Sequence, residues 1–140
     1  MKNSITTVIP DFYEWPHRWK ALPEDVEYGK NVLPIFEAFL EYLIQSGLTK
    51  KTIQRHADNL WLLGGEIIRE IDMNSEKRDK KPIELISKKI GPDGGPYCRH
   101  LESEAEMKSF DTTCRKLYRF LQNTDFTDLD WRRCQNERTR

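Results

Sequence analysis

The chain has 140 residues, of which 37% are hydrophobic and 33% charged, and its 23 lysines and arginines balance its 23 aspartates and glutamates. This length favours a single domain with one hydrophobic core. A net charge of zero argues against a protein that coats nucleic acid indiscriminately, because such proteins carry a strong basic excess. The chain has no apolar stretch of membrane-spanning length, and its N-terminus lacks the apolar run of a secretory signal. We therefore expect a cytoplasmic protein that has no contact with the membrane.

Residues 1–30 are expected to form an irregular, aromatic N-terminal arm. Prolines in this segment argue against a long helix. Its aromatic residues argue against disorder, so the arm is predicted to pack its rings over a helical core. Trp15 and Trp19 are also candidate partner-binding residues, since exposed indoles are favoured anchors in protein interfaces.

The first main helix is predicted to begin near Pro23, because proline suits the first position of a helix. Gly29 and Pro34 interrupt the pattern, so one kinked helix and two abutting helices both remain open. This helix is expected to end at Gly47.

A second main helix is expected to follow Thr49, a good N-cap residue. The short link between these helices predicts a helical hairpin. Gly64 costs about 1 kcal/mol relative to alanine inside a helix, so we expect it to admit a crossing helix closely. The apolar positions of the second helix are spaced by three and four residues, which places them on one face: Ile53, Ala57, Leu60, Gly64, Ile67 and Ile71.

The first turn of this second helix carries two cations, Lys50 and Lys51. The positive end of the helix dipole disfavours each of them by about 0.3–1 kcal/mol, and such exceptions are frequent at functional sites. Together with Arg55 and the free N–H groups of the helix start, they would suit a phosphate. The alternative is a pair of solvated lysines on an exposed helix end, and the residues alone favour that alternative.

Two further helices are predicted in the second half of the chain. A short helix spans Pro82–Ile90, and a capping box at Ser103–Glu106 opens a long one. The long helix buries one apolar face, on which Cys114 is expected to be a small core residue. Its basic patch lies largely off this face and is a second candidate site. The alternative interpretation is that the patch is an ordinary solvated surface. That patch consists of Arg115, Lys116 and Arg119.

These elements predict an all-α fold with three parts: the arm (1–30), a helical domain (31–123) and a charged C-terminal tail (124–140). Within it, the segments Phe39–Leu43 and Gly47–Ile53 resemble the opening hairpin of the core-binding domain of phage integrases and other tyrosine recombinases. The Gly-Leu-Thr-x-x-Thr-Ile turn is the most specific part of this likeness. The later helices are similar too, and the likeness covers about residues 31–123. The arm, hairpin and last helix together also resemble a small stand-alone bacterial family of unknown role.

The resemblance implies a four-helix SAM-like bundle of two helical hairpins that clasps one side of duplex DNA. The recombinase catalytic domain, with its Arg-His-x-x-Arg element and nucleophilic tyrosine, has no counterpart among the 140 residues. The candidate DNA-binding residues are Thr49, Lys50, Lys51, Thr52, Arg55, Arg115, Lys116 and Arg119.

Two functions follow from these observations. The first is a non-catalytic DNA-binding accessory module of a mobile element, bacterial or phage. The alternative is a protein-interaction module that acts through the arm, such as an adaptor, an antitoxin-like partner or a phage-encoded inhibitor. An enzyme is not indicated, because no paired nucleophile and base, metal-ligand spacing or cofactor loop is present. We therefore expect no cofactor and no metal, and the sequence leaves the oligomeric state open.

Overall fold

The computed structural model describes residues 2–124, and this part of the chain is all α-helical, without a β-strand. The all-α prediction is thereby confirmed. Most of the tail expected at 124–140 lies outside the described residues. The elements, with η for a 3-10 helix, are α1 (Lys2–Val8), η1 (Phe12–Glu14), α2 (Trp15–Trp19), α3 (Asp25–Gln45), α4 (Lys50–Met73), η2 (Ser75–Asp79), α5 (Pro82–Lys89) and α6 (Glu104–Gln122).

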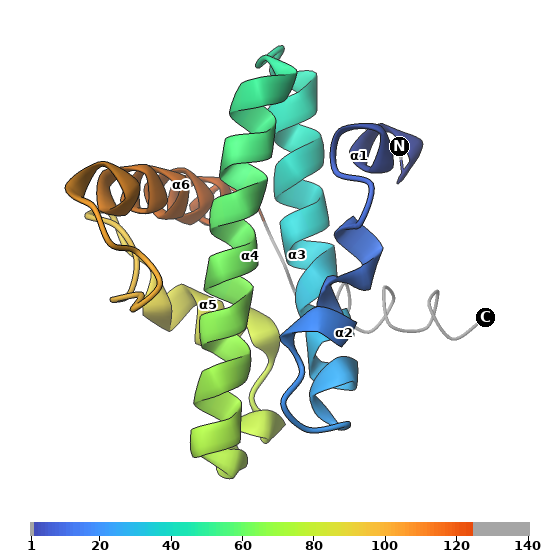
Figure 1. Ribbon diagram of the computed structural model, residues 1–140, viewed down its shortest axis with the longest axis vertical. Coiled ribbons are helices and arrows are strands. Elements are labelled where there is room, and N and C mark those ends of the chain that lie inside the picture. Colours follow the sequence, from blue (N-terminus) through green and yellow to red (C-terminus); the bar gives the residue numbers. More distant parts are fainter. Residues whose placement is uncertain (1, 125–140) are drawn as a thin grey trace.

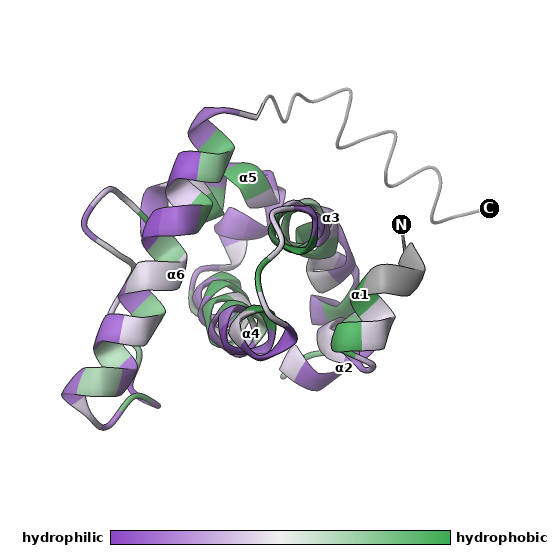
Figure 2. Cartoon of the chain, turned by 90° about the horizontal axis from the view of Figure 1, so that it is seen from above, coloured by the Kyte–Doolittle hydropathy of each residue, from purple (hydrophilic) through white to green (hydrophobic). Residues whose placement is uncertain are grey.

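The fold is organised around an antiparallel hairpin of α3 and α4, the two long helices of Figure 1. The arm elements α1 and α2 cover one side of this hairpin, and α6 lies on the opposite side with α5 beside it (Figure 2). α6 crosses α4 at a steep angle. Because α5 packs mainly against α3 and α6 mainly against α4, the central hairpin holds the second half of the bundle together.

The expected helix signals are present at the helix ends and on the buried faces. Thr49 caps α4, Ser103 and Glu106 form the predicted capping box of α6, and α5 begins at Pro82. The predicted apolar side chains of α4 are 3% exposed or less, from Ile53 to Ile71. The spacing of three and four residues therefore identified the core face of this helix correctly.

α3 is one continuous helix of 21 residues, although Gly29 and Pro34 lie inside it. Of the two possibilities that the sequence left open, the structure shows a single helix, and the expected boundary at residues 30/31 falls within it. Gly29 lies where α2 approaches most closely, because a Cβ atom there would be 2.9 Å from Cβ of Pro16. The arm is thus packed directly against the first main helix.

The aromatic arm forms part of the hydrophobic core, and it is built of short helices where an irregular segment was expected. The rings of Phe12, Trp15, Trp19 and Phe36 follow one another in contact, with successive centroids 4.8, 5.8 and 6.2 Å apart. Burying a side chain of this size contributes about 1.5–3 kcal/mol. The predicted packing of the arm over the helices is therefore confirmed.

Burial of the two indoles corrects the expectation that Trp15 and Trp19 bind a partner. Their exposed fractions are 3% and 9%. An interface anchor must be accessible in the free protein, and these rings are not. The surface of the arm that remains exposed therefore lacks the residues on which the partner-binding hypothesis depended.

Trp19 also explains the glycine at position 64 of α4. A Cβ atom at Gly64 would lie 2.1 Å from Cζ2 of the Trp19 indole, and the indole Nε1 donates a hydrogen bond of 2.9 Å to the carbonyl of Trp61. Gly64 thus accommodates an indole ring, and not the crossing helix expected from the sequence.

A buried carboxylate fixes the link between the arm and α3. Asp25 is fully buried, and its Oδ2 accepts hydrogen bonds of 2.8 Å from the N–H groups of Ala21 and Leu22. Its Oδ1 accepts from Nη2 of Arg78 in η2, at 2.7 Å. Burial alone would raise the pKa of Asp25, but these hydrogen bonds lower it. The arm, α3 and η2 are thereby tied to one charged centre.

The Gly64–Trp19 contact predicts different effects on stability for two adjacent substitutions. Gly64→Ala forces the indole out of place and breaks its hydrogen bond, so we expect the free energy of unfolding to fall by about 2 kcal/mol. Gly65→Ala is the matched control, because its Cβ would meet only Trp19 Cδ1, at 3.9 Å. This variant should retain its stability or gain up to about 1 kcal/mol from helix propensity. Urea unfolding measures both, and equal effects would contradict the assignment.

Candidate nucleic-acid interface

The start of α4 has the geometry that the sequence predicted. Gly47 ends the α3 segment with a positive φ of 82°. Thr49 Oγ1 then accepts a hydrogen bond of 3.2 Å from the N–H of Thr52, which satisfies one donor of the new helix. α4 therefore begins beside the end of α3, and Lys50 and Lys51 are exposed in its first turn.

α6 is attached to α4 by a buried polar cluster. Nδ1 of His56 and Oγ1 of Thr113 are 2.7 Å apart, and Nδ2 of Asn59 donates to the same Oγ1 at 2.8 Å. Asn59 also donates to the carbonyl of Ser109 at 3.1 Å. Thr113 Oγ1 accepts from Asn59, and its single hydroxyl proton lies within reach of two acceptors, the Ser109 carbonyl at 3.3 Å and Nδ1 of a neutral His56 ring at 2.7 Å.

Positive charge near this cluster acts on His56. Burial, followed by the charges of Lys116 and Arg55, lowers the pKa of the imidazole to about 4. The ring is therefore neutral at pH 7. The effect also shows that one cation from α6 and one from α4 lie near the same buried group.

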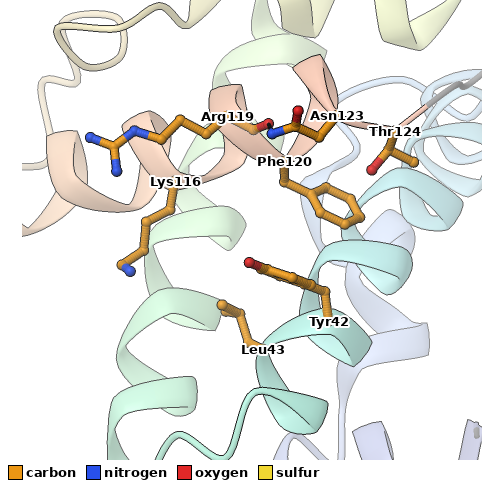
Figure 3. A pocket seen from close by; sticks show the side chains of 7 residues that line it. All are labelled: Tyr42, Leu43, Lys116, Arg119, Phe120, Asn123 and Thr124. Carbon is orange, nitrogen blue, oxygen red and sulfur yellow. Dashed lines mark hydrogen bonds between the residues drawn. The ribbon is translucent and has the colours of Figure 1, made fainter.

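A hollow lined by His56 and Ser109 opens over this cluster, and Lys116 borders both this hollow and a second one. One has a volume of about 570 Å³ and separates the start of α4 from α6. The other, of about 350 Å³, lies between the end of α3 and the end of α6 (Figure 3). We call them together the α6 groove, lined by Tyr42, Leu43, Leu48, Thr52, Arg55, His56, Ala105, Lys108, Ser109, Thr112, Lys116, Arg119, Phe120, Asn123 and Thr124.

Among residues 2–124, the α6 groove is lined by cations and by no carboxylate, although acids and bases are equally numerous in the chain. The four cations that these residues contribute are Arg55, Lys108, Lys116 and Arg119. Within residues 2–124 none of them forms a salt bridge. Their positive charge is therefore not neutralised by a neighbouring side chain of the described structure.

Only part of the predicted DNA-binding set lies in this groove. Thr52, Arg55, Lys116 and Arg119 line it. In Figure 3 the Lys116 side chain extends along the opening of the smaller hollow, and Arg119 extends from α6 in another direction. The structure therefore brings together cations from the two predicted segments, α4 and α6.

The other predicted residues lie beside the groove or away from it. Thr49 and Lys51 are exposed in the turn before Thr52 and Arg55 but do not line the groove. Lys50 precedes Gln54 by one turn, and Gln54 donates to the carbonyl of Val8, so Lys50 lies on the arm side of α4.

Arg115 does not line the groove, although it binds Thr112 at its edge. Its Nη2 donates to Oγ1 of Thr112 at 3.0 Å, and its Nη1 donates to the carbonyl of Asp93 in the glycine-rich loop at 3.4 Å. The expectation that all the selected cations share one surface is thus met only in part.

Sequence reasoning missed Lys108. Its spacing to Lys116 and Arg119 is eight and eleven residues, which places the three on one face of a helix. This spacing is a usable signal, but an exposed lysine near a helix start is common and does not by itself indicate a site.

Other reactive groups in the described structure offer little chemistry. Cys98 and Cys114 are buried free thiols, and burial raises both pKa values, that of Cys114 to about 12. Nowhere in residues 2–124 do three or more His, Cys, Asp or Glu side chains gather as metal ligands would. Over the same range no helix combines the length and apolar character needed to cross a membrane.

Comparisons of the chain with protein-family models, curated proteins and solved structures give no match. The likeness to integrase core-binding domains therefore depends on the quoted sequence motifs alone. Function must be argued from the site itself.

The lowered pKa of His56 predicts that stability depends on pH. Its value is about 4 in the folded protein against 6.5 for a free histidine, so the unfolded chain binds the extra proton first. Stability should therefore be complete above pH 6.5 and fall as the pH drops toward 4, by up to about 3 kcal/mol.

The control for this prediction is His56→Gln, which cannot titrate. Asp72 titrates in both proteins, with a pKa raised to about 6 by burial and by Asp25, so the difference between the two curves isolates His56. Urea unfolding measured across this pH interval should give a flatter profile for the variant. Parallel profiles would contradict the prediction.

Proposed function

We propose that the protein is a non-catalytic nucleic-acid-binding module whose α6 groove contacts the backbone phosphates of duplex DNA. One observation carries this proposal: the groove gathers four cations from two helices, without a carboxylate and without a salt bridge among the described residues. In the free protein these four cations repel one another, which raises its free energy. An anionic ligand would relieve that repulsion.

Electrostatics at the base of the groove support this assignment. The lowered pKa of His56 reflects the positive potential of Arg55 and Lys116 in addition to burial. Surface cations are normally solvated and destabilise a protein little. Here the electric field of Arg55 and Lys116 also acts on the buried imidazole of His56. A bound phosphate would oppose that field, so the groove is electrostatically complementary to an anion.

The dimensions of the groove also suit a phosphate backbone. Lys108 and Arg119 are eleven residues apart on α6, which corresponds to about 16 Å along the helix. One strand of duplex DNA places about five phosphates over that distance. Arg55 borders the same groove from α4, so cations would flank the backbone on two sides.

Contacts of this kind position DNA without reading its sequence. Four phosphate contacts on a protein of zero net charge predict weak binding, with a Kd of about 10⁻⁴ to 10⁻⁶ M at physiological salt. The proposal accordingly describes an accessory module and not a sequence-specific regulator.

Salt dependence of DNA binding tests the proposal. With four phosphate contacts the slope of log K against log salt should be about −3.6, because each contact contributes about −0.9. The double variant Arg55→Gln/Lys116→Gln should halve this slope and weaken binding about tenfold or more. Fluorescence anisotropy with a labelled duplex measures both quantities.

Lys20→Gln provides the matched control for charge. Lys20 is an exposed cation next to α2, on the side of the hairpin opposite α6. Its removal should leave the salt slope unchanged. Absence of duplex binding, or equal losses in the control and the double variant, would refute the proposed function.

A further inference from the structure

An aromatic pair of one exposed and one partly buried ring lies at the end of the α6 groove where α3 meets α6. Tyr42 of α3 and Phe120 of α6 have ring centroids 5.2 Å apart and planes inclined by 36°. Phe39 supports Phe120 from the core, with centroids 5.5 Å apart. Tyr42 itself is 52% exposed. The core therefore holds one ring in place, while the second presents much of its surface to solvent.

Figure 3 shows how the smaller hollow of the groove is bordered. The Tyr42 ring lies along one side, with Phe120 above it, and the Lys116 side chain extends toward the same opening. Asn123 donates Nδ2 to the carbonyl of Arg119, which fixes its amide at the rim and leaves the amide oxygen able to accept. A flat ring surface, a cation and an amide thus border one hollow.

We propose that this hollow binds an unpaired nucleobase, which stacks on Tyr42 while Lys116 and Arg119 hold the adjoining phosphates. This inference rests on the proposed function and defines its ligand as nucleic acid with an unpaired end. Inside a duplex the faces of the bases are covered by their neighbours, so away from the duplex ends an exposed aromatic ring can stack only on a base that has left the helix or lies in a single strand.

Charge and size favour this occupant over others. The part of the chain that the structure describes contributes Lys116 and Arg119 to the hollow and no carboxylate, which disfavours a cationic peptide. Its volume of about 350 Å³ is at the lower end for ligand sites and suits one ring system. An acidic peptide would match the charge, but its carboxylates would not use the aromatic surface of Tyr42.

Three matched DNA ligands test the inference with the full-length chain. They are a short blunt duplex, the same duplex with a single-stranded overhang of about four nucleotides, and that duplex with an abasic overhang that keeps the phosphates. We expect the overhang to bind about tenfold more tightly than the blunt or abasic forms, from stacking of one base.

Tyr42→Ala should abolish this preference for the overhang, whereas Tyr42→Phe should retain it. Urea unfolding checks that both variants are folded, as expected for a side chain that is 52% exposed. Equal binding of all three DNA ligands would overturn the inference and leave the proposed function standing. Failure to bind any of them would refute the proposed function itself. Equally tight, Tyr42-dependent binding of an oligoglutamate peptide would also overturn the inference.

Discussion

The position of α6 depends on the hydrogen bonds among His56, Asn59 and Thr113. Apolar contacts alone are non-directional and would allow α6 to slide along α4. Directional hydrogen bonds between buried groups select one arrangement, because leaving any of these groups unpaired costs about 1–3 kcal/mol. The steep crossing of α6 over α4 is thereby fixed. The α6 groove exists only in that arrangement, since its lining comes from α3, α4 and α6 together.

The same cluster explains how the protein tolerates unpaired cations above it. A neutral His56 adds no charge beneath Arg55 and Lys116, and burial together with those cations keeps it neutral. A stability-driven sequence would place carboxylates among such cations. Their absence among the described residues of the groove is an exception to that rule, and exceptions of this kind concentrate at functional sites. The candidate site is therefore identified by cations that no neighbouring carboxylate of the described structure neutralises, and not by a set of catalytic residues.

Sequence periodicity predicted the faces of single helices but not the relations between helices. The spacing from Ile53 to Ile71 identified the buried face of α4, because 3.6 residues per turn is a local property. The contact of Trp19 with Gly64 joins residues 45 positions apart, and no local pattern encodes it. For the same reason the sequence could not show that Arg115 points to the glycine-rich loop while Lys116 points into the groove.

Net charge was also an incomplete guide, because the charges are segregated in space. Asp25 and Asp72 both bind Arg78, and Glu70 binds Lys77 and Lys89. Much of the acidic charge near η2 is thus neutralised at one end of the hairpin. Cations of the groove remain without such partners within residues 2–124. A neutral total therefore coexists with a local positive surface, and attraction between this protein and an anion must be short-ranged. Because exposed charges are screened over about 8–10 Å in physiological salt, the proposed recognition would depend on how well the ligand fits the groove.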